Sequence, residues 1–248
     1  MFPIRDHNPS RHPAIVTYAL MAVNIAVFLA MLPAYADDAK LIQVFSDYAL
    51  VPARISAGEG YFTFVTSTFM HGGFMHIAGN MLFLWIFGDN LEDEMGHIPY
   101  LGFYLICGFA AGFAQYIAAP HISVPMVGAS GAIAGVMGGY LLLFPKARVD
   151  VLFIFIVIFK VIPFPAWLML GIWFGLQVFG GLGASSEGGG VAYLAHAGGF
   201  IAGVLLAHPL WQRLGGIQFW NRHHGHPPHA AARYRFEQSN IPSVRRRR

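Results

Sequence analysis

Charge is scarce in this chain of 248 residues: only 11% of the residues are Asp, Glu, Lys or Arg, whereas 56% are hydrophobic. A soluble domain averages about 25% charged residues. So few charges cannot cover a water-exposed surface, which excludes an ordinary soluble domain and makes the bilayer the solvent for much of the chain. No polar stretch is long enough for a second domain, so we expect one membrane domain with tails.

Cysteine is almost absent as well. Cys107 is the single cysteine, so no intramolecular disulfide is possible. It lies in an apolar segment, where a free cysteine behaves as a small buried hydrophobic side chain. A cleavable leader is not indicated either, because no small-residue cleavage site follows the first apolar run before Asp37 and Asp38. We therefore expect that run to be retained as the first span.

Long apolar runs are the dominant feature of the sequence. A helix needs roughly 20 apolar residues to cross about 30 Å of hydrocarbon. Six segments meet this need, although one of them gives a weaker signal because it carries His76 and Asn80. The predicted fold class is therefore all-α, a polytopic membrane protein with a bundle of six transmembrane helices. The segments are 14–32, 73–91, 98–118, 126–144, 164–181 and 191–208.

Residues 151–162 form a twelve-residue apolar run that is too short to span, and Lys160, Pro163 and Pro165 interrupt its end. We interpret the run as an interfacial or packed connector. With six spans and a cytoplasmic N-terminus, just two cationic residues, Lys40 and Arg54, face the opposite side. The positive-inside rule then favours both termini in the cytoplasm. The cytoplasmic cations are Arg5, Arg11, Lys146, Arg148, Lys160, Arg213, Arg222, Arg233, Arg235, Arg245, Arg246, Arg247 and Arg248.

Polar side chains recur at one depth of this predicted bundle. The second, fourth and sixth spans all run inward, and they carry His76 with Asn80, Ser130 and His196 in their first turns. At 1.5 Å per residue, these side chains lie within roughly 5–12 Å of the outer helix ends. Polar groups inside a membrane are costly and usually face the protein interior or water. Each could merely bridge helices, but that interpretation does not explain the common depth.

Small residues surround the serine and the histidine. Ser130 lies in the sequence Gly-Ala-Ser-Gly, from Gly128 to Gly131, and His196 is followed by Gly199 and Gly203. Small residues let helix backbones approach closely. A hydrogen bond of about 2.6–3.2 Å between a nucleophile and its base on two helices needs such an approach.

Three motifs in this order resemble the rhomboid family of intramembrane serine proteases, the prokaryotic six-span type. They are HGGFMHIAGN from His71 to Asn80, GASG from Gly128 to Gly131, and AHAGGFIAG from Ala195 to Gly203. The stretch FGDNLEDEMG from Phe87 to Gly96 also resembles the family's connection between the second and third spans. The resemblance covers residues 14–208.

The resemblance implies a role for each matching position. Ser130 would be the nucleophile and His196 its general base, acting as a dyad because the fourth and sixth spans lack Asp and Glu. Asn80, His76 and the backbone N–H of Ser130 would form the oxyanion hole. Supporting positions are His71, Gly128, Gly131, Gly199 and Gly203. Ala134 departs from the pattern, since many members carry an aromatic residue there, and the stretch near Phe62 and Thr63 lacks the family's Trp-Arg pair.

The predicted organisation has three parts: a cytoplasmic segment at 1–13, a six-span protease domain at 14–208, and a basic, disordered cytoplasmic tail at 209–248. We expect a multi-pass protein of the plasma (inner) membrane. Its partners would be transmembrane protein substrates and the lipid bilayer, with no nucleic acid, and the sequence leaves the oligomeric state open. No cofactor and no metal is implied.

Rival functions fit less well. The zinc motif H-E-x-x-H is absent, and no span carries the pair of Asp residues that aspartyl chemistry needs. A transporter would show internal repeats, which we do not find. A catalytically inactive rhomboid-like protein that binds membrane clients is the alternative, although Ser130 and His196 are both present.

Overall fold

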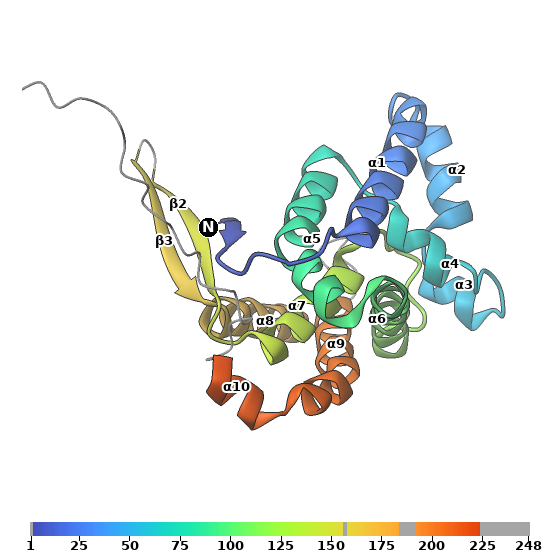
Figure 1. Cartoon of the computed structure of the whole chain (residues 1–248). Coiled ribbons are helices and arrows are strands. Elements are labelled where there is room, and N and C mark those ends of the chain that lie inside the picture. Colours follow the sequence, from blue (N-terminus) through green and yellow to red (C-terminus); the bar gives the residue numbers. More distant parts are fainter. Residues whose placement is uncertain (1, 156–157, 184–191, 224–248) are drawn as a thin grey trace, which may run out of the picture.

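The computed structural model describes residues 2–155, 158–183 and 192–223, and it is mostly helical (Figure 1). Its elements in chain order are β1 (Phe2–Asp6), α1 (Ile15–Tyr35), α2 (Asp38–Tyr48), α3 (Pro52–Ser56), α4 (Thr63–Thr66), the 3-10 helix η1 (Ser67–Phe69), α5 (Phe74–Met95), α6 (His97–Ala118), α7 (Ser130–Leu143), β2 (Arg148–Phe155), β3 (Ile158–Pro165), α8 (Ala166–Gly183), α9 (Tyr193–Leu214) and α10 (Ile217–His223).

Each of the six apolar segments contains a helix, but these helices differ in length and polarity. By length and composition, α1, α6 and α9 are able to cross a membrane. The apolar helix α7 has 14 residues, and α5 ends in the acidic run Glu92, Asp93 and Glu94. Large apolar side chains such as Leu29, Ile106 and Phe179 are exposed on the outer faces of the helices, as a protein solvated by lipid requires.

Helix α7 forms the centre of the bundle and contacts α5, α6, α8 and α9. Almost every one of its residues is buried, including its glycines, so it is surrounded by protein rather than lipid. The core continues through Leu84, Phe87, Tyr100 and Tyr140, which are fully buried. The position of α7 is therefore fixed by its contacts with four other helices.

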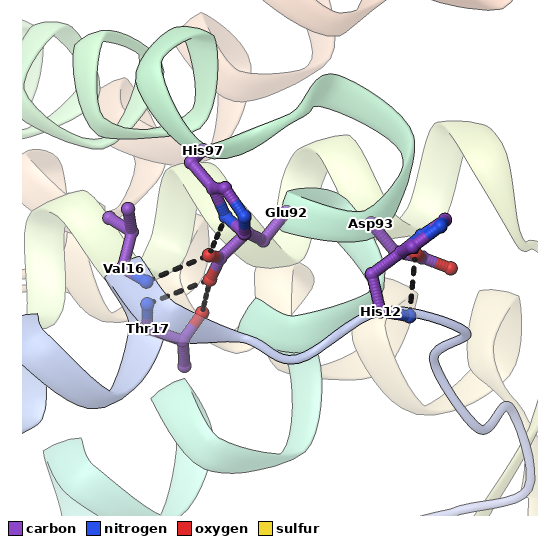
Figure 2. Close-up of polar contacts among 6 residues, drawn as sticks. All are labelled: His12, Val16, Thr17, Glu92, Asp93 and His97. Atoms are coloured by element: carbon purple, nitrogen blue, oxygen red, sulfur yellow. Dashed lines mark hydrogen bonds and ion pairs between the residues drawn. The ribbon is translucent and has the colours of Figure 1, made fainter.

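The N-terminus of α1 is capped by a carboxylate from another helix (Figure 2). Ala14 at the N-cap has no side-chain acceptor, so the first N–H groups of α1 need a partner from elsewhere. The side chain of Glu92, at the end of α5, accepts from the N–H groups of Val16 and Thr17 at 2.7 and 2.8 Å. It also bonds to the Thr17 hydroxyl at 2.7 Å and to Nδ1 of His97 at 2.6 Å. This buried carboxylate therefore joins α1, α5 and α6.

A three-stranded antiparallel sheet, in the order β1-β2-β3, lies beside the helices (Figure 1). The all-α prediction is wrong at this point. Residues 151–162 do form a connector rather than a span, but its structure is a hairpin, because a short run of valine, isoleucine and phenylalanine suits a strand as well as a helix. Asp150 fixes β1 to this hairpin by accepting from Nε of Arg5 at 2.7 Å and from Nε2 of His7 at 2.8 Å.

The connection between α1 and α5 holds the short helices α2, α3 and α4 and η1, none of which was predicted. It is tied to the segment before α7, since Leu50 pairs with Met126 in an isolated bridge and the Ala53 N–H donates to the Ile122 carbonyl at 3.0 Å. Figure 1 shows these helices and the sheet on opposite sides of the bundle.

The predicted tail begins too early. Helix α9 continues through Pro209 to Leu214, and α10 then packs against the bundle. Trp220 of α10 donates from its indole N–H to the Leu142 carbonyl at 3.0 Å. Pro209 removes a backbone donor inside α9, and the tertiary packing of the helix tolerates that loss. Residues 224–248 of the predicted tail lie outside the described residues.

Candidate active site

Ser130 is the first residue of α7, not one turn inside the helix as the sequence predicts. The preceding loop causes the difference. Gly128 has a φ of +132°, which residues other than glycine rarely adopt, and its N–H donates to the Ser67 carbonyl at 2.9 Å. The N–H of Ser130 thus belongs to the first turn, where backbone donors have no intrahelical acceptor and the helix dipole favours negative charge.

His196 lies in the first turn of α9, and its imidazole reaches the serine. Nε2 of His196 is 2.7 Å from the Ser130 hydroxyl oxygen. The other ring nitrogen, Nδ1, is 2.8 Å from Oε1 of Gln177 on α8. An amide oxygen can only accept, so Nδ1 carries the proton. Nε2 of the neutral ring is then the acceptor for the Ser130 hydroxyl, which is the arrangement of a nucleophile and its general base.

Glycines set the spacing between the helices that carry this pair. A Cβ atom at Gly199 would collide with the carbonyl oxygen of Gly131, and one at Gly203 with the carbonyl oxygen of Gly135. The backbones of α7 and α9 are therefore in direct contact just below Ser130 and His196. This contact contains three glycines that the sequence predicts to pack helices, Gly131, Gly199 and Gly203.

His76 and Asn80, one turn apart on α5, lie beside the serine. Nδ1 of His76 accepts from the Gly72 N–H at 3.2 Å, which leaves the proton of the neutral ring on Nε2. This nitrogen faces Gly128, where an added Cβ would be 2.8 Å from it. Nδ2 of Asn80 donates to the His76 carbonyl at 3.0 Å and has a second hydrogen to offer.

His71 lies behind His76 rather than at the serine. Its ring is fully buried and meets the ring of His76 edge-on, with centroids 5.2 Å apart. The hydroxyl of Tyr35 donates to the His71 carbonyl. This placement supports the position of His76 and gives His71 no direct contact with Ser130 or His196.

A cavity of about 860 Å³ joins these groups, and its lining includes His76, Asn80, Ser130 and His196. Its wall is completed by α8 and by the non-helical segment before α7. The cavity can hold a peptide segment together with water. Within the described ranges, no three His, Cys, Asp or Glu residues cluster in a way that could hold a metal ion.

Two residues at the site were missed by sequence analysis, Gln177 and Trp173 of α8. Gln177 is buried against Nδ1 of His196, and the Trp173 ring lies 5.9 Å from the imidazole between centroids. A signal for Gln177 existed, because it is an amide inside an otherwise apolar span, and such residues usually face the protein interior. Gln177 lies outside all three motifs, so the sequence does not link it to His196.

The site thus combines a serine hydroxyl bonded to an imidazole with several N–H donors, inside the helical bundle of a membrane protein. Comparison with protein families makes the assignment specific. Residues 58–213, more than half of the chain, match the model described as the Rhomboid domain. The chain belongs to the rhomboid family.

Several relatives carry rhomboid names. "Rhomboid protein 1, mitochondrial" of Saccharomyces cerevisiae is 33% identical over 202 residues, covering 78% of this chain and 53% of the yeast protein. "Rhomboid-like protein 11, chloroplastic" of Arabidopsis thaliana is 26% identical over 206 residues, covering 82% of this chain and 68% of the plant protein. "Rhomboid protease GluP" of Bacillus subtilis is 30% identical over 126 residues, covering 50% of this chain and 24% of GluP. The chain thus spans about half the length of the yeast relative and about a quarter of GluP.

Proposed function

We propose that this protein is an intramembrane serine endopeptidase that cleaves transmembrane segments of other membrane proteins. The observation that carries the proposal is the 2.7 Å contact between the Ser130 hydroxyl and Nε2 of His196, in a cavity lined by further donors. Membership of the rhomboid family and the printed name of GluP, a rhomboid protease, support the same activity.

The proposed chemistry follows from the proton positions at the site. Oγ of Ser130 attacks a peptide carbonyl carbon while Nε2 of His196 takes the hydroxyl proton. The new oxyanion accepts from the Ser130 N–H and from the side chains of His76 and Asn80. The protonated His196 then gives its proton to the leaving amine. Water from the cavity hydrolyses the acyl-enzyme, with His196 again accepting a proton.

The substrate class follows from the depth of Ser130. A 14-residue helix is about 21 Å long, shorter than the roughly 30 Å of hydrocarbon, so one end of α7 is recessed. Irregular backbone is tolerated at membrane depth only where it is buried in protein or lines a water-filled cavity, and the segment before α7 lines the cavity. The proposed six spans are the apolar segments 14–32, 73–91, 98–118, 126–144, 164–181 and 191–208, which contain most of α1, α5, α6, α7, α8 and α9, and the acidic end of α5 lies outside them. A peptide bond that reaches Ser130 then belongs to a membrane segment, which must unwind to expose its carbonyl.

An inactive protein that binds membrane clients is the second candidate, since family membership alone does not establish catalysis. The bonded Ser130 and His196 favour the protease. The two candidates differ in what happens to a bound client: the protease releases two fragments, and the inactive protein retains the intact chain.

The test is cleavage of a fluorogenic transmembrane substrate in proteoliposomes. Wild type should cleave it, and Ser130→Ala should abolish cleavage while keeping the melting temperature of wild type. Cleavage that persists in Ser130→Ala would exclude the serine mechanism. An intact substrate that co-purifies with the wild-type protein would favour the inactive client-binding protein.

A further inference from the structure

The imidazole of His196 is held on both of its nitrogens. Ser130 occupies Nε2, and Oε1 of Gln177 lies 2.8 Å from Nδ1. Gln177 is 8% exposed, so water offers little competition for this contact. Its amide orientation is constrained as well, because Nε2 of Gln177 points at the Trp173 carbonyl, 3.5 Å away and one turn earlier, and a carbonyl can only accept.

This arrangement selects one tautomer of His196. A neutral imidazole has one proton, and general-base action on Ser130 requires Nε2 to be free to accept. An acceptor at Nδ1 stabilises the tautomer with the proton on Nδ1. Without that acceptor, the ring could also carry its proton on Nε2, and this tautomer cannot accept the proton of Ser130. When His196 takes the serine proton, Nδ1 still donates, so the same oxygen serves both protonation states. An amide is a known third partner in Cys-His-Asn proteases.

The ring plane of His196 is fixed from the same helix. The Trp173 indole lies one turn before Gln177, with its centroid 5.9 Å from the imidazole and an interplanar angle of 35°. Trp173 and Phe174 also pack on Phe200, which lies one turn after His196 on α9. Ala134 of α7 has just a methyl group and provides no ring. Both the acceptor and the aromatic contact of His196 therefore come from α8.

We propose that Gln177 is a positioning residue that holds His196 as the Nδ1-protonated tautomer, so that the catalytic unit has three members, Ser130, His196 and Gln177. The proposal rests on the proposed protease function. Gln177 touches neither substrate nor the reacting atoms and acts through His196.

The kinetic test compares Gln177→Leu, which keeps the approximate size but removes the acceptor, with Gln177→Glu, which keeps an acceptor oxygen. Loss of the acceptor should lower kcat by about 10- to 100-fold with little change in KM, since wrong-tautomer effects reach about 10⁴-fold where an ionised partner is lost. Gln177→Glu should retain most of the wild-type kcat. Leu176→Ala, at a neighbouring position that is 61% exposed, is the matched control and should behave as wild type. A near-normal kcat in Gln177→Leu, or equal losses in both Gln177 variants, would overturn the proposal.

The second measurement needs no activity and so separates this proposal from the protease function. In ¹⁵N-histidine spectra, the His196 signals are those missing from His196→Ala. Wild type should show a protonated Nδ1 and an unprotonated Nε2, and Gln177→Leu should show a mixture of tautomers. An unchanged tautomer in Gln177→Leu would overturn the role of Gln177 even in an active protease. A wild-type protein with the expected tautomer but no cleavage would overturn the protease function and leave the positioning role supported.

Discussion

At the residue scale, the proposed chemistry depends on neighbours more than on Ser130 itself. A serine hydroxyl is a weak nucleophile at neutral pH and needs an adjacent base. His196 provides the base, and the start of α7 directs the Ser130 N–H toward the place where negative charge would develop. His76 and Asn80 add side-chain donors from another helix. The side-chain contributions of His196, His76 and Asn80 can each be removed separately by substitution.

Substitution of Asn80 tests whether this residue acts in catalysis or only in helix packing. As an oxyanion donor it acts in the transition state, so Asn80→Ala should lower kcat by about 10- to 1,000-fold with KM barely changed. The lower end is expected because His76 offers a second donor. Asn24→Ala is the matched control, since Asn24 is also buried and makes the same bond to the carbonyl four residues earlier, far from the cavity. A near-normal kcat in a folded Asn80→Ala protein would remove Asn80 from the site.

Glu92 should control stability and its pH dependence. Burial raises the pKa of Glu92, but hydrogen bonds from Thr17, Val16 and His97 outweigh burial and the pKa is lowered below its ordinary value of 4.5. A carboxyl whose pKa is lowered on folding stabilises the protein above its unfolded pKa, and this contribution is lost as the pH falls through the folded pKa.

We therefore expect Glu92→Gln to lower the free energy of unfolding at pH 7 by about 1–3 kcal/mol, as for other bonds to charged groups. Its stability should also vary less with pH below 4.5 than that of wild type. Thermal unfolding in detergent from pH 3 to 7 measures both effects. Glu94→Gln is the control, because burial raises the pKa of Glu94 and neutralising it should cost nothing. Equal melting temperatures for wild type and Glu92→Gln would contradict the capping role.

At the element scale, the contact between α7 and α9 sets the distance from Ser130 to His196. Glycine is required there because the two backbones touch, so any side chain at Gly199 or Gly203 meets a carbonyl of α7. Glycine at these positions thus serves both the stability of the bundle and the geometry of the site.

Gly203→Ala should separate these two effects. Its Cβ would meet the backbone of Gly135, which cannot move aside as a flexible side chain can, so the variant should lose about 1–3 kcal/mol of stability. Cleavage should fall by more than the lost folded fraction explains, since α9 carries His196. Gly102→Ala in α6 is the control, because nothing lies within 4 Å of its added Cβ. The result that contradicts this account is wild-type activity and stability in Gly203→Ala.

The elements also differ in how well the sequence predicts their structure. Apolar runs located the six helices, and the common depth of their polar side chains brought Ser130 and His196 into one site, as the structure places them. The hairpin of β2 and β3 was missed because a twelve-residue apolar run carries no period that separates strand from helix. Gln177 stood out as an amide in an apolar span, but its contact with His196 depends on the rotation of α8 against α9, which no sequence spacing encodes.

At the scale of the whole molecule, the distribution of Lys and Arg residues predicts the orientation of the bundle in the membrane. Lys40 and Arg54 lie in α2 and α3, whereas Arg5, Lys146 and Arg148 lie in or beside the sheet on the other side of the bundle (Figure 1). From the positive-inside rule we propose that the sheet lies in the cytoplasm. The names of the yeast and Arabidopsis relatives refer to mitochondria and chloroplasts, whereas that of GluP refers to neither, and we propose the plasma membrane for this chain.

Tags at the two ends test this orientation. In right-side-out vesicles, both tags should be protected from added protease, whereas a cleavage site inserted after the exposed Glu59 should be cut. Detergent should expose both tags. Cleavage of the C-terminal tag alone in intact vesicles would mean that the number of spans is odd, and cleavage of both tags would mean the opposite orientation.

The most direct test of the central claim is the identity of the residue that reacts. The full-length protein in liposomes is treated with a fluorophosphonate probe, and the labelled peptide is mapped by mass spectrometry. The account predicts one modified residue, Ser130, with labelling abolished in Ser130→Ala and strongly reduced in His196→Ala. Labelling at another serine, or equal labelling of Ser130 in wild type and His196→Ala, would contradict it.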